Sequence, residues 1–146
     1  MYRKILVPLD GSTAAEKVLP HVLDLARTHN AEIVLLQVPL YAYADETAHT
    51  KRLMFQKERE QAVCESRKYL NKIRSNLIRL GVRTSTAIEE GQAAPRIIAY
   101  ARKTNVDVIA MVSQVQTSWH RILYGSVIEE VMRGAGKPVL LINPNV

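Results

Sequence analysis

The pair Gly125-Ser126 could bind an anion, because it stands directly before an apolar run with helical spacing. A helix N-terminus presents unpaired N–H groups and a partial positive charge, and glycine lets the backbone come close to a phosphate. The same residues also suit a structural role, in which Ser126 caps the helix and Glu129 reaches back to complete a capping box. The pair alone leaves both interpretations open.

A second polar turn, from Asp10 to Thr13, follows the first apolar run of the chain. An aspartate at such a position often forms an Asx turn with the backbone two residues on. The spacing of Thr13 and Glu16 predicts another capping box, at the start of a helix that ends near Asn30.

Residues for catalysis or metal binding form no recognisable set in the sequence. The four histidines have no metal-like spacing to one another, to Cys64 or to a pair of carboxylates. The sequence contains neither a G-x-S-x-G elbow nor a Walker A lysine motif. We therefore expect a protein that is not an enzyme and that needs no metal.

The net charge of +6 raises the question of nucleic-acid binding. Half of the 20 Lys and Arg residues lie between Lys51 and Arg83, in a segment that has the pattern of one long helix. Lys57, Lys68, Lys72 and Arg79 project roughly opposite the apolar stripe of this helix, as on a solvated face. No aromatic or groove-reading motif accompanies the charge, so we expect no nucleic-acid partner. The stripe consists of Val63, Ser66, Leu70, Ile73, Leu77 and Leu80.

Strand-like and helix-like segments alternate through the chain, without a repeat or a linker. This order predicts one open α/β domain over residues 1–146, with a parallel sheet whose carboxyl edge gathers ligands. No apolar run is long enough for a signal peptide or a membrane helix, so we expect a cytoplasmic protein without a membrane partner. The expected strands are residues 3–8, 32–38, 82–88, 106–111 and 138–142, and the expected helices begin after Thr13, near Lys51, near Pro95 and at Ser126.

Three segments give the chain a resemblance to the universal stress protein family over nearly its whole length. I-L-V-P-L-D-G-S resembles the family's first strand and loop, N-V-D-V-I-A-M its fourth strand, and G-S-V-I-E-E-V-M-R-G-A-G-K-P-V-L-L-I its last helix and strand. The resemblance implies an adenine nucleotide alpha hydrolase-like fold, with five strands in the order 3-2-1-4-5 and helices on both faces. It also implies a homodimer through the edge strand from Pro138 to Ile142.

Members of that family that bind ATP carry a glycine, two residues, a second glycine, nine residues, and then Gly-Ser or Gly-Thr. Gly125-Ser126 matches the far end of this motif, but Val112 and Val115 stand where the two glycines belong. Valine rarely adopts a positive φ, and its methyl groups would lie where charged oxygens should be solvated.

The resemblance also carries the family's nucleotide contacts to residues that this chain retains. Its adenine and ribose end corresponds to Pro8, Asp10 and Val38. Met111 corresponds to the residue ahead of the phosphate loop. The far phosphate contacts correspond to Gly125, Ser126 and Val127.

From these departures we expect a dimeric stress-response and regulatory module that lacks the full ATP-binding loop and has no resident cofactor. It would act through an unidentified protein or small ligand. The alternative is a member that binds ATP or another adenine nucleotide with a divergent phosphate loop. A third interpretation is a nucleotide-hydrolysing enzyme of the same broad fold. The sequence does not name the stress, the partner or the role of residues 39–50.

Overall fold

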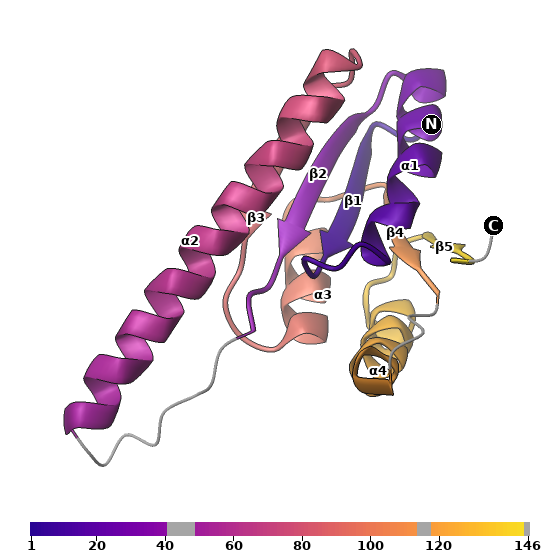
Figure 1. Ribbon diagram of the computed structural model, residues 1–146. Helices are drawn as coiled ribbons and strands as arrows, with labels where there is room; N and C mark the ends of the chain where they lie inside the picture. Colours follow the sequence, from indigo (N-terminus) through magenta and orange to yellow (C-terminus); the bar gives the residue numbers. More distant parts are fainter. Residues whose placement is uncertain (41–48, 114–117, 145–146) are drawn as a thin grey trace.

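The computed structural model describes residues 1–40, 49–113 and 118–144, with side chains at 1–40, 55–113 and 126–144 (Figure 1). Strands and helices alternate as the sequence predicts. The elements are β1 (Lys4–Leu9), the 3-10 helix η1 (Ala15–Val18), α1 (Leu19–His29), β2 (Glu32–Gln37), α2 (His49–Arg79), β3 (Thr84–Ile88), α3 (Ala93–Lys103), β4 (Val108–Val112), α4 (Ser118–Gly134) and β5 (Val139–Ile142).

The five strands form one parallel sheet in the order β3-β2-β1-β4-β5, which confirms the predicted fold class and strand order. Strand β1 pairs with β2 on one side and with β4 on the other. Strands β2 and β3 are therefore added on one side of β1, and strands β4 and β5 on its other side. Such a switch point opens a crevice at the carboxyl ends of the strands, where ligands of open α/β sheets usually bind.

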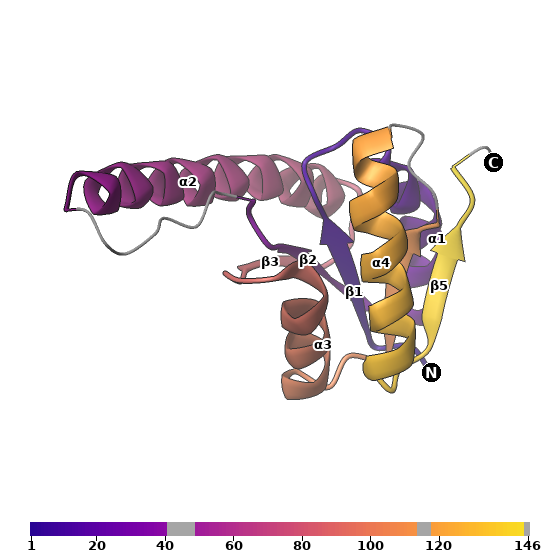
Figure 2. The same cartoon turned by 90° about the horizontal axis from the view of Figure 1, so that it is seen from below.

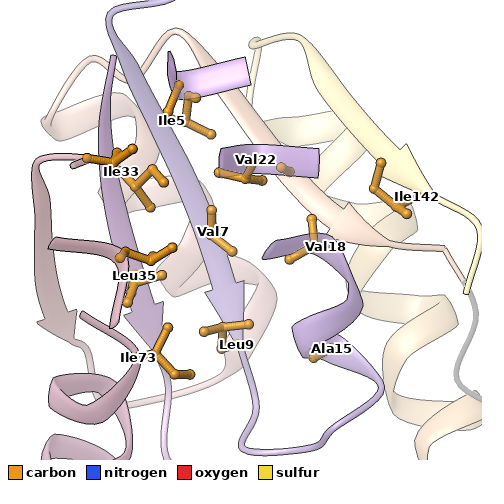
Figure 3. Packing of buried hydrophobic residues seen from close by; sticks show 14 of the residues in the cluster. Ile5, Val7, Leu9, Ala15, Val18, Val22, Ile33, Leu35, Ile73 and Ile142 are labelled. Atoms are coloured by element: carbon orange, nitrogen blue, oxygen red, sulfur yellow. The ribbon is translucent and has the colours of Figure 1, made fainter. Parts of the chain in front are cut away.

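Two apolar layers hold the helices against the sheet. One layer joins Ile5, Val7 and Leu9 of β1 to α1 and to α2, and the side chains of this layer point from the strands toward α1 in Figure 3. The other layer joins Leu6 and Met111 to α3 and α4. Strand residues that alternate between two buried faces are typical of a parallel sheet covered by helices on both sides.

Helix α2 is packed along only part of its length. Leu70, Ile73 and Leu77 are buried against the sheet, and Ser66 is buried one turn earlier, as the apolar stripe predicts. Leu80 was expected in this stripe but is 48% exposed, because the helix has ended at Arg79. The first half of α2 extends well beyond the sheet (Figure 2), and residues 56–61 are exposed.

The first helical segment begins differently from the prediction. The predicted Thr13–Glu16 capping box is wrong, because the Ser12 hydroxyl accepts the Ala15 N–H at 3.2 Å. A 3-10 turn then leads into α1, which ends where predicted, with Asn30 in the left-handed conformation at φ 52°.

The last helix also begins earlier than predicted. Helix α4 starts at Ser118, so Ser126 lies in its interior and is not a cap. The Ser126 hydroxyl lies 3.4 Å from a carboxylate oxygen of Glu130, one turn further on. Glu129 forms an ion pair with Arg133 and does not reach back to the Ser126 N–H. The predicted Ser126–Glu129 capping box is therefore wrong.

Candidate ligand-binding site

A cavity of about 350 Å³ lies at the carboxyl ends of β1 and β2, where helix α2 passes over them. This volume is at the lower end of the range of small-molecule sites, about 300–1,000 Å³. Its walls come from three parts of the chain that are distant in sequence. They are Asp10 and Gly11 after β1, residues 37–40 at the end of β2, and Ala62, Glu65, Ser66 and Tyr69 of α2.

The turn after β1 fixes the position of Asp10 at the cavity. Its Oδ1 atom accepts the Ser12 N–H at 2.9 Å and the Ser12 hydroxyl at 2.6 Å. This is the Asx turn that the sequence predicts. Gly11 has a φ of +88°, which glycine adopts without strain. The carboxylate is therefore held by a short local network, with the same Ser12 hydroxyl beginning the next helical turn.

Buried polar atoms of Gln37 and Tyr69 belong to residues of the cavity wall. They are Oε1 of Gln37 and the hydroxyl oxygen of Tyr69, and no hydrogen bond of ordinary geometry reaches either one within the described part of the chain. Such atoms lose their hydration without replacement, which is unusual in a folded protein. The wall combines the apolar Val38, Pro39 and Leu40 with the carboxylate residues Asp10 and Glu65, and neither of the two buried atoms has appreciable accessible surface in the cavity.

The phenol of Tyr69 is held in its neutral form. Burial raises the pKa of this phenol far above its ordinary value, and the negative charge of Glu16 raises it further. Asp10 adds a smaller effect in the same direction. The Glu16 carboxylate is thus close enough to act on the phenol, although the two do not meet in a hydrogen bond of ordinary geometry. The hydroxyl group remains protonated throughout the ordinary pH range.

The structure brings together only part of the predicted nucleotide site. Asp10 and Val38 both line the cavity. Pro8 is buried within β1, one strand position beyond Val7. Met111 is 2% exposed and lies in the core layer beneath α4, where the half-buried Val127 packs against it. None of the last three is among the described residues of the cavity wall.

The predicted phosphate end has a different local structure. Gly125 and Ser126 lie inside α4, where backbone N–H groups donate to carbonyls one turn earlier and are not free for an anion. Val112 is the last residue of β4, is 2% exposed and pairs with Ile142 of β5. Val115 lies outside the described residues. A glycine-like turn at residue 112 is therefore replaced by a strand with a buried side chain.

Of the ten described residues of the cavity wall, only Asp10 and Val38 were predicted as site residues, and the eight others include Gln37, Glu65 and Tyr69. Gln37 is the polar residue that closes an apolar strand at the carboxyl edge, and this pattern could have identified it. Tyr69 lies between Ser66 and Leu70 beside the apolar stripe of a helix, which is a weaker signal. Glu65 has the appearance of an ordinary exposed helix residue.

Groups that could bind a metal were searched over the part of the chain that the structure describes. No cluster of three or more His, Cys, Asp or Glu side chains occurs there. In the same ranges no helix combines the length and the apolar character that crossing a bilayer requires.

Known proteins of this architecture share both sequence and fold with the chain. Universal stress protein MJ0531 of Methanocaldococcus jannaschii is 30% identical, over 97% of this chain and 82% of that protein. The solved structure of MJ0577, from the same organism, is 31% identical with a TM-score of 0.81, over 98% and 96% of the two chains. An Arabidopsis thaliana family protein with AMP bound is 17% identical with a TM-score of 0.66, over 97% and 91%, and this likeness concerns the fold alone.

A model of a whole protein family also matches the chain. The model of the universal stress protein family matches residues 1–143, which includes every strand of the sheet. The match agrees with the resemblance carried by the first strand, the fourth strand and the last helix. The chain belongs to the universal stress protein family.

Proposed function

We propose that this universal stress protein is a non-enzymatic regulatory module of the cytoplasm. Its ligand site lacks the unpaired backbone N–H groups that would bind the triphosphate of ATP. The observation that supports it is the course of α4, which begins at Ser118 and encloses Gly125-Ser126. A phosphate site at a helix start needs N–H groups without intrahelical partners, and an interior position has none to offer. Val112 at the end of β4 supports the same conclusion, because its buried side chain stands where the motif has a glycine.

The test is a titration of the purified protein with ATP. Calorimetry measures the heat of binding, and a thermal melt measures the change in melting temperature. We expect no heat of binding and no rise in melting temperature at millimolar ATP with Mg²⁺, and no nucleotide released from the purified protein by acid. A Gly125→Val variant should behave like the wild type. Bound ATP that is lost in Gly125→Val would overturn the proposal.

A second candidate ligand is an adenine nucleoside or monophosphate, and the cavity favours it. Asp10 and Val38 line the same space, which would leave the adenine and ribose end available without a triphosphate site. AMP and adenosine would then raise the melting temperature where ATP does not, and Asp10→Ala would remove the rise. Equal responses to AMP in the wild type and in Asp10→Ala would exclude this candidate.

The proposed module is a homodimer through β5. This strand is an edge of the sheet, and its Val139, Leu140 and Leu141 are only partly buried. The Ile109 N–H donates to the Pro138 carbonyl, and the Ser113 N–H donates to the Ile142 carbonyl. Backbone groups of the alternate residues therefore point away from β4, and an apolar edge of this kind is usually covered or paired.

Light scattering after gel filtration tests the dimer. Leu141→Pro removes an outward N–H without removing a bond to β4, and we expect it to give a monomer. Val139→Lys places a charge on the same edge and should act in the same direction if the proline variant does not fold. A wild-type protein that is monomeric at micromolar concentration would exclude this part of the proposal.

A further inference from the structure

The excess positive charge of the chain is concentrated at the amino-terminal edge of the sheet. In a parallel sheet with helical crossovers, each helix ends at the edge where the next strand begins, as α1 and α2 do in Figure 1. The segments at this edge contain nine of the 20 Lys and Arg residues and two of the 14 Asp and Glu residues, which leaves eleven basic and twelve acidic residues for the rest of the chain. The segments are 1–4, 26–32, 77–84, 100–107 and 131–138.

On the β3 side of this edge, two exposed arginines join segments that are distant in sequence. Arg27 of α1 donates to the Leu80 carbonyl at 2.8 Å, just beyond the end of α2. Arg83 donates to the Asn30 carbonyl at 3.2 Å, just beyond the end of α1. Both acceptors are uncharged oxygens, so these contacts fix the positions of the two guanidinium groups without neutralising their charge.

On the β5 side, two lysines make similar contacts. Lys4 at the start of β1 donates to the Thr104 carbonyl at 3.4 Å, just beyond the end of α3. Lys137 before β5 donates to Oδ1 of Asn105 at 2.7 Å. The basic residues therefore continue across the whole sheet, whose five strands, at a spacing of about 4.8 Å, give a row of about 19 Å.

Helix dipoles account for only part of this charge. The C-terminus of a helix carries about half a negative charge, and basic residues in the last turn offset it. Helices α1 to α4 all end at this edge, so their dipoles balance about two positive charges. The nine basic and two acidic residues of the five segments give a net charge of +7. The larger part of the charge therefore faces solvent without a balancing dipole.

Exposed apolar side chains lie among these cations. Ile78 and Leu80 at the end of α2 are 45% and 48% exposed, and Met132 in the last turn of α4 is 55% exposed. A hollow of about 440 Å³ adjoins Ile78 between α2 and β3, and its lining includes Arg74 and Arg83. Single exposed apolar side chains are common on protein surfaces. Their mixture with many Lys and Arg residues on one surface is typical of proteins that lie on anionic lipid.

We propose that the amino-terminal edge of the sheet docks reversibly on the surface of an anionic phospholipid bilayer. Its cations would face the lipid phosphates, and Ile78, Leu80 and Met132 would enter the headgroup region. Nucleic acid or an acidic protein would use the same charges but has no need of the apolar side chains, which is why the observations favour lipid. The cytoplasmic leaflet of a membrane has the required negative charge.

The proposal goes beyond the proposed function and is compatible with it. The expectation of no membrane partner was based on the length that a spanning segment needs, and contact with a bilayer surface needs no such segment. The ligand cavity lies at the carboxyl ends of β1 and β2, at the opposite edge of the sheet. A protein docked in this way would therefore keep its cavity open to the solution.

Co-sedimentation with vesicles tests the docking. The vesicles contain either equal parts of phosphatidylglycerol and phosphatidylcholine or phosphatidylcholine alone. At about 0.1 M salt we expect binding to the mixed vesicles and none to phosphatidylcholine, and at about 0.5 M salt we expect the affinity to fall by about tenfold or more, since salt screens the attraction. Absence of binding to the mixed vesicles, or equal binding to both kinds, would overturn the proposal.

A pair of charge variants locates the surface. Arg79 and Lys103 are exposed in the last turns of α2 and α3, and the double variant Arg79→Gln/Lys103→Gln should bind the mixed vesicles about 25-fold more weakly, at about fivefold per basic residue. Lys57→Gln/Lys68→Gln is the matched control, with the same net charge but with exposed positions of α2 outside the five segments. It should bind as the wild type does. Equal losses in the two double variants would overturn the proposal.

A third variant distinguishes lipid from other polyanions. Leu80→Ser/Met132→Ser leaves the charge unchanged and should weaken vesicle binding by about tenfold, because half-exposed apolar side chains no longer enter the bilayer. Duplex DNA and polyglutamate should bind the wild type more weakly than the mixed vesicles do. Tighter binding of either polyanion, or unchanged vesicle binding by the serine variant, would show that the surface does not recognise lipid and would overturn the proposal.

Discussion

The carboxyl edge of the sheet has two sides, and they differ in what their backbones leave available. On the β1–β2 side, the Asx turn, Gly11 and helix α2 line a cavity. On the β4–α4 side, the strand continues through Val112 and the helix encloses Gly125-Ser126. One side has retained an opening of ligand size, and on the other the groups that would bind phosphate are paired within regular structure.

This difference shows that a retained motif residue does not by itself retain a site. Gly125 and Ser126 are still present in the sequence, but their value to a phosphate depends on where the helix starts. Asp10 depends less on distant structure, because its geometry is fixed by Ser12, two residues away. A site built from one local turn thus survives changes elsewhere better than a site that needs a particular helix end.

The largest expected effect tests the helix that forms the cavity wall. Leu70 is fully buried beneath α2, so Leu70→Ala should lower the free energy of unfolding by about 3 kcal/mol. Met132 of α4 is 55% exposed, and Met132→Ala should change it by less than about 0.5 kcal/mol. Urea denaturation measures both. Similar losses in the two variants would mean that α2 is not anchored through its buried stripe.

The next effect tests the β4–α4 side. Val112→Gly restores one glycine of the motif, but it removes a buried side chain and loosens a strand, so we expect a loss of about 2–3 kcal/mol. We expect no gain in ATP binding, because α4 keeps the N–H groups of Gly125 and Ser126 paired. Val112→Ala separates lost packing from backbone freedom. An ATP affinity that appears in Val112→Gly alone would show that the valine, and not the helix, blocks the site.

A smaller effect concerns Asp107, which lies just before β4 and joins it to the start of β1, at the amino-terminal edge of the sheet. Its Oδ2 accepts the N–H groups of Arg3 and Lys4 at 2.8 and 2.9 Å. The Arg3 N–H is the main cause of a lowered pKa of Asp107, which Lys4, Lys137 and the Arg3 charge assist. A lowered pKa stabilises the fold above the ordinary value of 3.8, and this contribution is lost as the pH falls through the folded-state pKa.

Asp107→Asn should therefore lower stability by about 1 kcal/mol at neutral pH. The difference from the wild type should close as the pH falls below about 4, because the wild-type carboxyl is then protonated. Asp24→Asn changes an exposed carboxylate of α1 and is the control. Melting temperatures across this pH range test the sign. A gap between variant and wild type that widens in acid would contradict it.

The smallest effect compares two serines that each follow a glycine in the sequence, Ser12 and Ser126. Ser12 accepts the Ala15 N–H, so Ser12→Ala should destabilise the protein by about 1 kcal/mol. Ser126 lies inside α4, where alanine is the better helix former, so Ser126→Ala should be neutral or slightly stabilising, within about 0.5 kcal/mol. A loss of about 1 kcal/mol in Ser126→Ala would indicate that the helix begins at Ser126.

The strands could be predicted because short apolar runs between turn residues have few alternatives. The run Ile5 to Leu9 and the run Ile33 to Leu36 are buried on both faces, and their unbroken apolar sequences predict this. Helix starts were harder to predict. The spacing from Ser126 to Glu129 is compatible with a capping box and equally with the interior of a helix that began earlier.

The cavity could be predicted only in part. Asp10 and Val38 were identified through the family resemblance, and both line it. Gln37 and Tyr69 come from a strand and a helix that are far apart in the sequence, and their unsatisfied atoms exist only once α2 lies over β2. No local pattern carries that information. The acidic character of the wall has the same origin, because it is hidden within a chain of positive net charge.

The partial packing of helix α2 also has a consequence for how well the cavity wall is protected from local unfolding. Its 31 residues span about 46 Å, and only the second half is packed on the sheet. Ala62, Glu65 and Tyr69 lie near the junction of the packed and projecting halves. Amide hydrogen exchange should therefore be fast over residues 56–61 and slow beyond Ser66. The cavity wall lies on this gradient, so a ligand that bridges β2 and α2 would move the protected boundary toward the N-terminus of the helix.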